Sequence, residues 1–345
     1  MTMSVLLTGG AGYIGSHAAL ALLQSGFRVC VIDNLTNGST EALRRVQEIA
    51  GKELHWVEGD VRDGHLLRRL LIQHGIEAVL HFAGLKSVGQ SVLDPLTYYD
   101  NNIGGTLQLC QAMSEAGVHK LVFSSSATVY GDPATIPVVE SCPTSSPENP
   151  YGQTKLMAER MLSDLARADA RWRIAVLRYF NPAGAHASGL IGEDPREIPN
   201  NLLPYVSQVA TGRLKAVQIF GNDYPTPDGT GIRDYIHVVD LVEGHVSALK
   251  RLKNQSGLDV WNLGAGRGYS VLEVIKAFER VSGKSVDFNY APRRSGDIAQ
   301  CWADPSKAWR ELGWKAQRGL EEMLGDAWRW QSANPNGYRD DELTI

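Results

Sequence analysis

The stretch SVLLTGGAGYIGSH, residues 4–17, decides the fold. It joins a short apolar run to three glycines at the spacing G-x-x-G-x-x-G, and then to a helix-like segment. Glycines here permit a tight turn, and the free N–H groups that begin the helix attract a pyrophosphate. Glycine triplets also occur in plain turns, but a place between a strand and a helix is the context that the motif requires. We therefore expect contacts with a dinucleotide from Gly9, Gly12, Tyr13, Ile14 and Gly15.

Outward from this loop, apolar runs and amphipathic stretches alternate through the first 180 residues. The expected strands are Ser4–Thr8, Arg28–Asp33, Leu54–Glu58, Ala78–Phe82, Lys120–Ser124 and Ile174–Arg178. The expected helices include Gly15–Ser25, Thr40–Ile49 and His65–His74. Such alternation predicts βαβ units and a parallel sheet with helices on both faces.

After Asn181 the elements become shorter, and glycine, proline and charged residues interrupt them. The stretch GNDYPTPDGTGIRD, Gly221–Asp234, predicts a long ordered loop, and such loops are often functional. We expect an α/β protein with a Rossmann doubly wound parallel sheet. Residues 1–180 would form the dinucleotide-binding domain and 181–345 a smaller α/β substrate domain, with the segment near 236–252 packing back on the first.

Composition and charge exclude several other classes of protein. The net charge of −4 argues against a nucleic-acid binder, and no apolar run approaches the roughly 20 residues of a membrane span. The four cysteines form no C-x-x-C pair, and no histidine lies at metal-ligand spacing from a cysteine or carboxylate. We therefore expect no nucleic-acid partner, no membrane association, no metal, and a cytoplasmic location.

Acidic and small residues follow the next strands at the same edge of the sheet. Asp33 ends the second strand, where a carboxylate binds ribose hydroxyls and repels a 2′-phosphate, which favours NAD over NADP. The alternative is that Asp33 only caps the following turn. Asp60, beside Val61, would meet the adenine, and the backbone of Phe82, Ala83, Gly84, Leu85 and Lys86 would line the phosphates. His81 fits a packed strand residue better than a catalyst.

A candidate catalytic pair lies in the segment Tyr151-Gly-Gln-Thr-Lys155, which opens a predicted helix after Pro150. Residues four apart share one helix face. A free tyrosine has a pKa of about 10, and we expect the nearby Lys155 ammonium and a cationic nicotinamide to lower it. Tyr151 would then serve as a base near neutral pH, with Ser126 bridging its phenol and a substrate hydroxyl. Alone, the Y-x-x-x-K pattern is usually a surface pairing.

Together these residues resemble the extended short-chain dehydrogenase/reductase family, and within it the UDP-glucose 4-epimerases. The resemblance runs nearly end to end through LLTGGAGYIGSH, HFAGLKSVGQS, YYDNN, FSSSATVYGD, NPYGQTK, LRYFNPAGAH, IPNNLLPY, IFGNDYPTPDGTGIRDYIHVVDL, NLGAG and PRRSGD. It implies oxidation of a UDP-hexose at carbon 4 by tightly bound NAD, rotation of the 4-keto sugar, and reduction from the opposite face.

The resemblance also assigns roles to residues. Tyr151 is the base, Ser126 the proton relay, and Lys155 the group that lowers the pKa and contacts ribose. Further NAD contacts fall on Asn34, Leu35, Thr36, Asn37, Gly38, Asn101 and Phe180. The UDP-sugar contacts, besides Ser126 and Tyr151, fall on Asn181, Asn201, Leu202, Gln218, Ile219, Phe220, Arg233, Arg294, Asp297 and Cys301. Both arginines suit a diphosphate, although each alone would more often form a surface ion pair.

Two rival activities are disfavoured. Dehydratases on this scaffold place an acidic pair where this chain has Ala127 and Thr128, and decarboxylating relatives place a glutamate at Thr128. Non-catalytic NAD sensors typically lack the Tyr/Lys pair, which is present here.

Substrate range and assembly are further expectations from the resemblance. Where the family often carries a tyrosine, this chain has Cys301, which predicts room for N-acetylated UDP-sugars; the alternative is a small buried cysteine without such a role. The family usually forms homodimers, and the candidate helices are Pro95–Ala116 and Asn149–Ala168. Apolar stripes on those helices could equally face the sheet.

Overall fold

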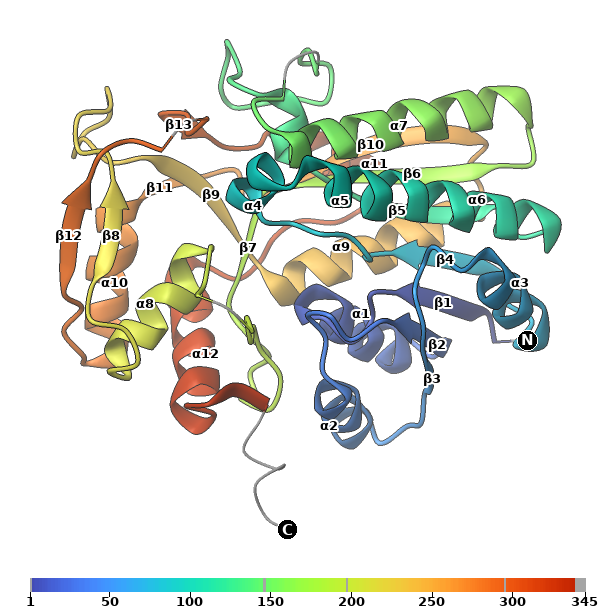
Figure 1. Ribbon diagram of the computed structural model, residues 1–345, viewed down its shortest axis with the longest axis horizontal. Helices are drawn as coiled ribbons and strands as arrows, with labels where there is room; N and C mark the ends of the chain where they lie inside the picture. Colours follow the sequence, from blue (N-terminus) through green and yellow to red (C-terminus); the bar gives the residue numbers. More distant parts are fainter. Residues whose placement is uncertain (1, 145–146, 197, 295, 339–345) are drawn as a thin grey trace.

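A seven-stranded sheet organises the molecule (Figure 1). The computed structural model describes residues 2–144, 147–196, 198–294 and 296–338. The strand order is β10-β6-β5-β4-β1-β2-β3, and every pair is parallel. The bounds are β1 Ser4–Thr8, β2 Arg28–Asp33, β3 His55–Glu58, β4 Ala78–His81, β5 Lys120–Ser126, β6 Arg173–Tyr179 and β10 Gly257–Leu263. The predicted parallel α/β sheet is confirmed.

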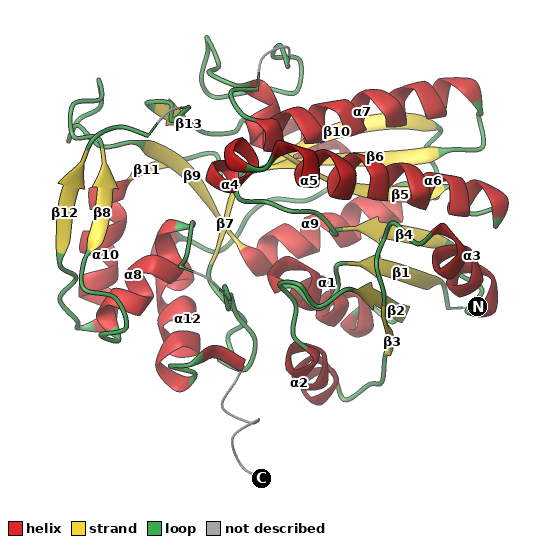
Figure 2. Ribbon diagram, viewed as in Figure 1, coloured by secondary structure: helices red, strands yellow, loops and turns green. Residues whose placement is uncertain are grey.

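Helices cover both faces of this sheet, which explains why its central strands are largely apolar (Figure 2). Neighbouring Leu6 and Leu7 of β1 are both fully buried, although they point to opposite faces. Leu7 packs in a core with α1 (Tyr13–Gln24), α2 (Thr40–Ala50), α9 (Val238–Arg251) and α11 (Ser306–Leu312). Leu6 packs in a second core with α3 (Gly64–Gln73), α6 (Gly105–Glu115) and α7 (Pro150–Ala168).

The second half of the chain contributes to this layer. Strand β10 pairs with β6 along its whole length, and α9 packs against α1. The sequence analysis did not assign β10 to the sheet, because its run GLDVWNL resembles the other short elements after Asn181. The Rossmann layer therefore includes residues well beyond the expected boundary at residue 180.

A second region carries its own core beside the first (Figure 1). Its strands are β7 Asn181–Ala183, β8 Val217–Phe220, β9 Ile232–His237, β11 Gly268–Ser270, β12 Phe288–Ala291 and β13 Gln300–Cys301. Its helices are α8 Leu202–Ala210, α10 Val271–Ser282 and α12 Leu320–Ala333. Strand β9 pairs with β7, β11 and β13, whereas β8 pairs with β12.

Several expected element boundaries were wrong. The single helix predicted over Pro95–Ala116 is divided into α5 (Pro95–Tyr99), the π-helical turn η1 (Asp100–Gly104) and α6, and the shorter α4 (Val88–Leu93) precedes them. The π-helical turn places Asn102 where it contacts the loop after β4 and helix α7. Strand β5 continues through all three serines to Ser126, and the predicted long loop ends where β9 begins, at Ile232. Within the described ranges, no helix is both long and apolar enough to cross a bilayer.

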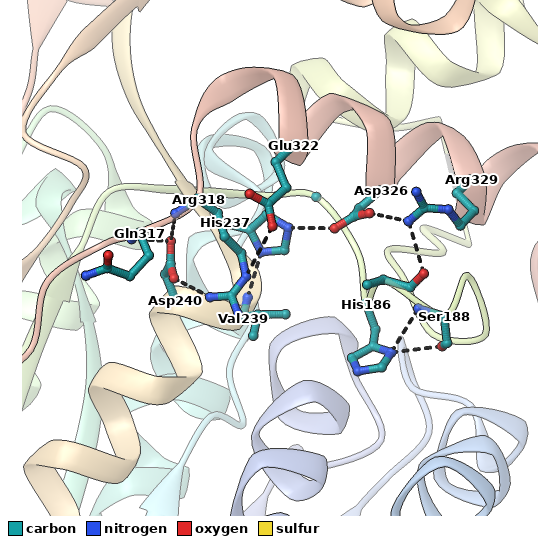
Figure 3. Close-up of polar contacts among 12 residues, drawn as sticks. His186, Ser188, His237, Val239, Asp240, Gln317, Arg318, Glu322, Asp326 and Arg329 are labelled. Atoms are coloured by element: carbon teal, nitrogen blue, oxygen red, sulfur yellow. Dashed lines mark hydrogen bonds and ion pairs between the residues drawn. The ribbon is translucent and has the colours of Figure 1, made fainter.

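A buried polar cluster ties α9 to the segment before α12 (Figure 3). Asp240 is fully buried and accepts hydrogen bonds from the backbone N–H groups of Gln317 and Arg318, and from the Arg318 guanidinium. His237 accepts from the backbone of Val239 at Nδ1, so its Nε2–H donates to Asp326, 3.2 Å away. These bonds hold α12 against α9, which covers one face of the main sheet.

We predict that Asp240→Ala lowers the free energy of unfolding by about 3–5 kcal/mol, because it leaves two backbone donors and a guanidinium without a buried partner. Glu243→Ala is the matched control, since Glu243 binds the same arginine at 3.3 Å from a half-exposed position. It should cost less than about 1 kcal/mol. Chemical denaturation of both variants measures the difference, and equal losses would contradict the assignment.

Candidate functional site

The glycine loop meets the ends of β2 and β4 with no room for side chains. Gly9 has a φ of +71°, and a Cβ there would lie 2.6 Å from the backbone N of Ala83. A Cβ on Gly15 would lie 2.1 Å from the Gly9 carbonyl oxygen. Helix α1 begins at Tyr13 without a side-chain cap, so its first N–H groups face outward and suit an anion.

Asp33, at the end of β2, organises the loops on both sides of it. Its Oδ2 accepts from the backbone N–H of Ala11 at 2.9 Å, and its Oδ1 accepts from that of Leu35 at 2.8 Å. Burial raises the pKa of this carboxyl, while the two backbone bonds lower it. The turn-capping role is thus present, and each oxygen retains a lone pair for ribose hydroxyls.

The residues expected around adenosine follow β2 and β3 and touch one another. Asn34 begins the loop that continues through Leu35, Thr36, Asn37 and Gly38, and its Nδ2 donates to Asp60 at 3.1 Å. Asp60 also forms an ion pair with Arg62, whose hydrogen bond holds the pKa of Asp60 well below its usual value. Val61 is buried beside Asp60. The structure therefore brings these two loops together.

Asn102, which sequence reasoning missed, joins the loop after β4 to α7. The π-helical turn η1 holds it beside Asn101, whose Nδ2 donates to it at 3.0 Å. Asn102 accepts from the Leu85 backbone N–H at 2.8 Å and donates to Thr154 Oγ1 at 3.0 Å. Such π-turns occur frequently at functional sites. The repeated asparagines of YYDNN were the only signal in the sequence.

The catalytic candidates lie where β5 ends and α7 begins. Tyr151 and Ser126 are both buried, Ser126 lies near enough to Tyr151 to act on its pKa, and Lys155 Nζ donates to the Ser124 carbonyl at 2.9 Å. Lys155 Nζ lies 6.0 Å from the centre of the Tyr151 ring. Asn149 caps α7 by accepting from the Gly152 backbone N–H. Helix α7 therefore fixes the positions of Tyr151 and Lys155 together.

The expected lowering of the Tyr151 pKa was wrong for the protein alone. Burial raises the pKa of Tyr151 to about 12, and the hydrogen bond with Ser126 only partly offsets this effect. Burial also lowers the pKa of Lys155 to about 8. Because a desolvated phenolate is costly, a positive charge beyond that of Lys155 must stabilise it before Tyr151 can act as a base near neutral pH.

A buried ion pair fixes the middle of α7. Arg178 of β6 and Glu159 of α7 are joined at 2.6 Å, and Ser125 donates to the same carboxylate. Sequence reasoning missed this pair, because neither residue belongs to a recognisable local motif. The pair fixes α7 to β6, and Ser125 fixes it to β5, next to the catalytic candidate Ser126.

The expected UDP-sugar residues come from β7, β8, β9, β13, α8 and the loop after β12. Asn201 precedes Leu202 at the start of α8 and donates to Glu193 at 2.9 Å, and Lys86 pairs with the same carboxylate. Lys86, which was expected to contact NAD, and Asn201, which was expected to contact the UDP-sugar, therefore meet at the Glu193 carboxylate. Asn181 is an exposed residue at the start of β7.

The two expected arginines lie around Tyr224, a residue that sequence reasoning missed. Arg294 stacks on Phe220, 4.5 Å from the ring centre, and pairs with Asp297 at 2.9 Å. Arg233 and Arg294 both lower the pKa of Tyr224, although burial raises it overall. The Tyr224 hydroxyl is buried without a hydrogen-bond partner in the described part of the chain. Gln218 and Ile219 precede Phe220 on β8.

Cys301 and Phe180 share one small apolar cluster beside the catalytic helix. Cys301 is buried on β13 and lies opposite Arg233 of β9 in the strand register. Its cluster includes Leu156 of α7, next to Lys155. The apolar surroundings of Cys301 therefore extend from Arg233 of β9 on one side to α7 on the other.

Comparisons with known proteins agree with this arrangement. The family model for the NAD dependent epimerase/dehydratase family matches residues 5–264. The UDP-glucose 4-epimerase of Bacillus subtilis is 62% identical over 340 residues, covering 99% of this chain and all of the relative. That of Haemophilus influenzae is 56% identical over 338 residues, covering 98% of this chain and all of the relative.

A solved structure resembles the whole chain. The UDP-glucose 4-epimerase of Bifidobacterium longum, in complex with NAD+ and UDP, is 53% identical with a TM-score of 0.95. The match covers 97% of this chain and all of that one. The resemblance inferred from the sequence is confirmed, and the chain belongs to the NAD dependent epimerase/dehydratase family.

Proposed function

We propose that the chain interconverts UDP-glucose and UDP-galactose by oxidation and reduction at carbon 4 of the sugar. The observation that carries this proposal is that Tyr151, Ser126 and Lys155 lie together where β5 ends and α7 begins, at the sheet edge where the glycine loop lies. Elimination of water would need an acid at position 127 or 128. Ala127 and Thr128 stand there, and Thr128 donates to Ser126 instead.

The residues present fit NAD as the resident cofactor. The uncapped start of α1 suits its pyrophosphate, and the free lone pairs of Asp33 suit the adenosine ribose. When bound, NAD supplies the hydride acceptor and donor at carbon 4, and its cationic nicotinamide supplies positive charge near Tyr151. Four unpaired cysteines agree with a reducing compartment, for which we propose the cytoplasm.

The protein's own groups then move the proton. Tyr151 takes the proton from the 4-hydroxyl and returns it after the 4-keto sugar has rotated. Ser126 holds that hydroxyl toward the phenol, and Lys155 keeps a positive charge below them. Arg233 and Arg294 bind the diphosphate by charge-assisted hydrogen bonds, so the sugar can rotate while the UDP stays fixed.

We predict that Tyr151→Phe lowers kcat about 10²–10⁴-fold, because the base is lost while the ring remains packed. Tyr269→Phe is the control, since Tyr269 is a half-buried tyrosine on β11 and should leave kcat unchanged. Coupled assays of UDP-galactose turnover measure both variants. Undiminished turnover by Tyr151→Phe would remove Tyr151 from its assigned role.

We also propose that N-acetylated UDP-sugars are substrates, because Cys301 occupies little volume between Arg233 and α7. Cys301→Tyr should reduce kcat/KM for UDP-N-acetylglucosamine at least 10-fold more than for UDP-glucose, since a larger side chain crowds the carbon 2 substituent. Cys301→Ser, which conserves the side-chain volume, should leave kcat/KM for both substrates unchanged. Absence of wild-type turnover of the N-acetylated sugar would end this proposal.

Exposed apolar residues support a homodimer through α4–α7. Leu93 and Leu96 are 85% and 79% exposed, and Leu107 and Met157 are exposed on α6 and α7. Apolar groups gathered on neighbouring helices typically mark an interaction surface. We therefore propose that this face packs against its copy.

We predict that Leu96→Glu converts a dimer to a monomer in sedimentation experiments, because it places a charge within the apolar interface. Trp309→Glu is the matched control, as Trp309 is 57% exposed on α11, outside that face. It should leave the dimer intact. A wild-type monomer, or dissociation by Trp309→Glu alone, would contradict the proposed interface.

A further inference from the structure

Cys30, His55 and His74 gather at a place unrelated to the nucleotide site. Their possible ligand atoms, one Sγ and two ring nitrogens, all lie within 4.8 Å of one another. Cys30 belongs to β2, His55 begins β3, and His74 caps the C-terminus of α3. The three residues therefore come from three different elements of the Rossmann layer.

The sheet register explains why the first two side chains meet. Cys30 and His55 are direct partners across the parallel pair of β2 and β3, so both point to the face covered by α3. Asp33 lies three residues further along β2, roughly 10 Å away, and points to the opposite face. The cluster is thus separated from the proposed cofactor contacts.

We propose that Cys30, His55 and His74 bind a divalent zinc ion, with water as the fourth ligand. Zinc takes cysteine sulfur and histidine nitrogen in a tetrahedron, which places the ligand atoms roughly 3.4–3.6 Å apart. The observed spacing requires the side chains to close by about 1 Å. His55 is exposed, so a rotation of its side chain can close that gap, and its exposure also opens the site to solvent.

Ring packing alone does not account for the cluster. The His55 and His74 rings lie 4.3 Å apart at an angle of 31°. The His74 Nε2 is nevertheless buried and has no hydrogen-bond partner within the described residues. An unsatisfied buried polar atom destabilises the folded state. A metal ion would satisfy this nitrogen and use the adjacent thiol and ring.

The chemistry of Cys30 selects the type of ion. Cys30 presents a thiol that is buried among apolar side chains. A bound ion must therefore displace the thiol proton, which leaves to solvent as the metal–sulfur bond forms. Ions with strong affinity for thiolate, such as zinc, achieve this, whereas magnesium and calcium prefer oxygen ligands.

A bound ion would stabilise the weakest edge of the sheet. Strand β3 is four residues long, lies at the sheet edge, and has largely exposed side chains. Zinc would attach it to β2 and to the end of α3. The segment that follows β3 contains Asp60 and Val61, so the ion would support a loop expected to contact adenosine without touching it.

Cobalt(II) titration of the full-length protein tests the proposal, because cobalt replaces zinc in such sites and absorbs in the near ultraviolet when bound to thiolate. We expect one equivalent to produce this absorption in wild type. Cys30→Ala and His55→Ala should abolish or strongly weaken it. Because His55 is exposed, His55→Ala gives a folded variant even if Cys30→Ala does not. Zinc should raise the thermal unfolding midpoint of wild type but not of His55→Ala.

Two matched controls make the result specific. Cys110→Ala removes another buried cysteine of the same core, and His65→Ala removes an exposed histidine of α3. Both should retain the thiolate absorption. No thiolate absorption in wild type, or absorption that persists in His55→Ala, would overturn the proposal. This test does not depend on catalytic activity.

Discussion

The close approach of backbone at residues 9–15 is the constraint on which the rest of the site depends. The turn between β1 and α1 touches the end of β4 at Ala83 and folds back on itself at Gly15. Asp33 then fixes it to β2 through the Ala11 N–H. The loop also anchors the second half of the chain, because the Tyr13 hydroxyl donates to the Gly184 carbonyl at 2.6 Å. A glycine-free loop could not bring these segments into contact.

The parts predicted from the sequence share a physical basis. Buried parallel strands are nearly continuous apolar runs, so six strands of the sheet could be predicted from the pattern of residues along the chain. The glycine loop, Asp33, Tyr151 and Lys155 belong to short motifs whose spacing reflects local geometry. Strand β10 was missed because pairing with β6 is a long-range event, and the sequence GLDVWNL carries no sign of its partner.

The electrostatics of the catalytic pair could not be predicted from spacing. Two residues that are four positions apart lie on one helix face, and this proximity suggested a lowered tyrosine pKa. In the structure, Lys155 is directed to the Ser124 carbonyl, and burial sets the direction in which the pKa of Tyr151 shifts. Asn102 and the Glu159–Arg178 pair were missed for a related reason, because their importance comes from contacts between distant elements. The positions of reactive groups were thus easier to infer than the strengths of their interactions.

The proposed metal site was not expected from the sequence, because it too depends on contacts between distant elements. Spacing rules detect ligands that share one loop or helix, where chain geometry alone brings them together. Cys30 and His55 approach through strand register, and His74 arrives with the end of a helix packed on that face. Only the folded sheet creates the cluster, so its absence from the linear pattern is no argument against it. A parallel sheet can therefore carry chemistry on two sites: the carboxyl ends of its strands, and any covered face where register aligns ligating side chains.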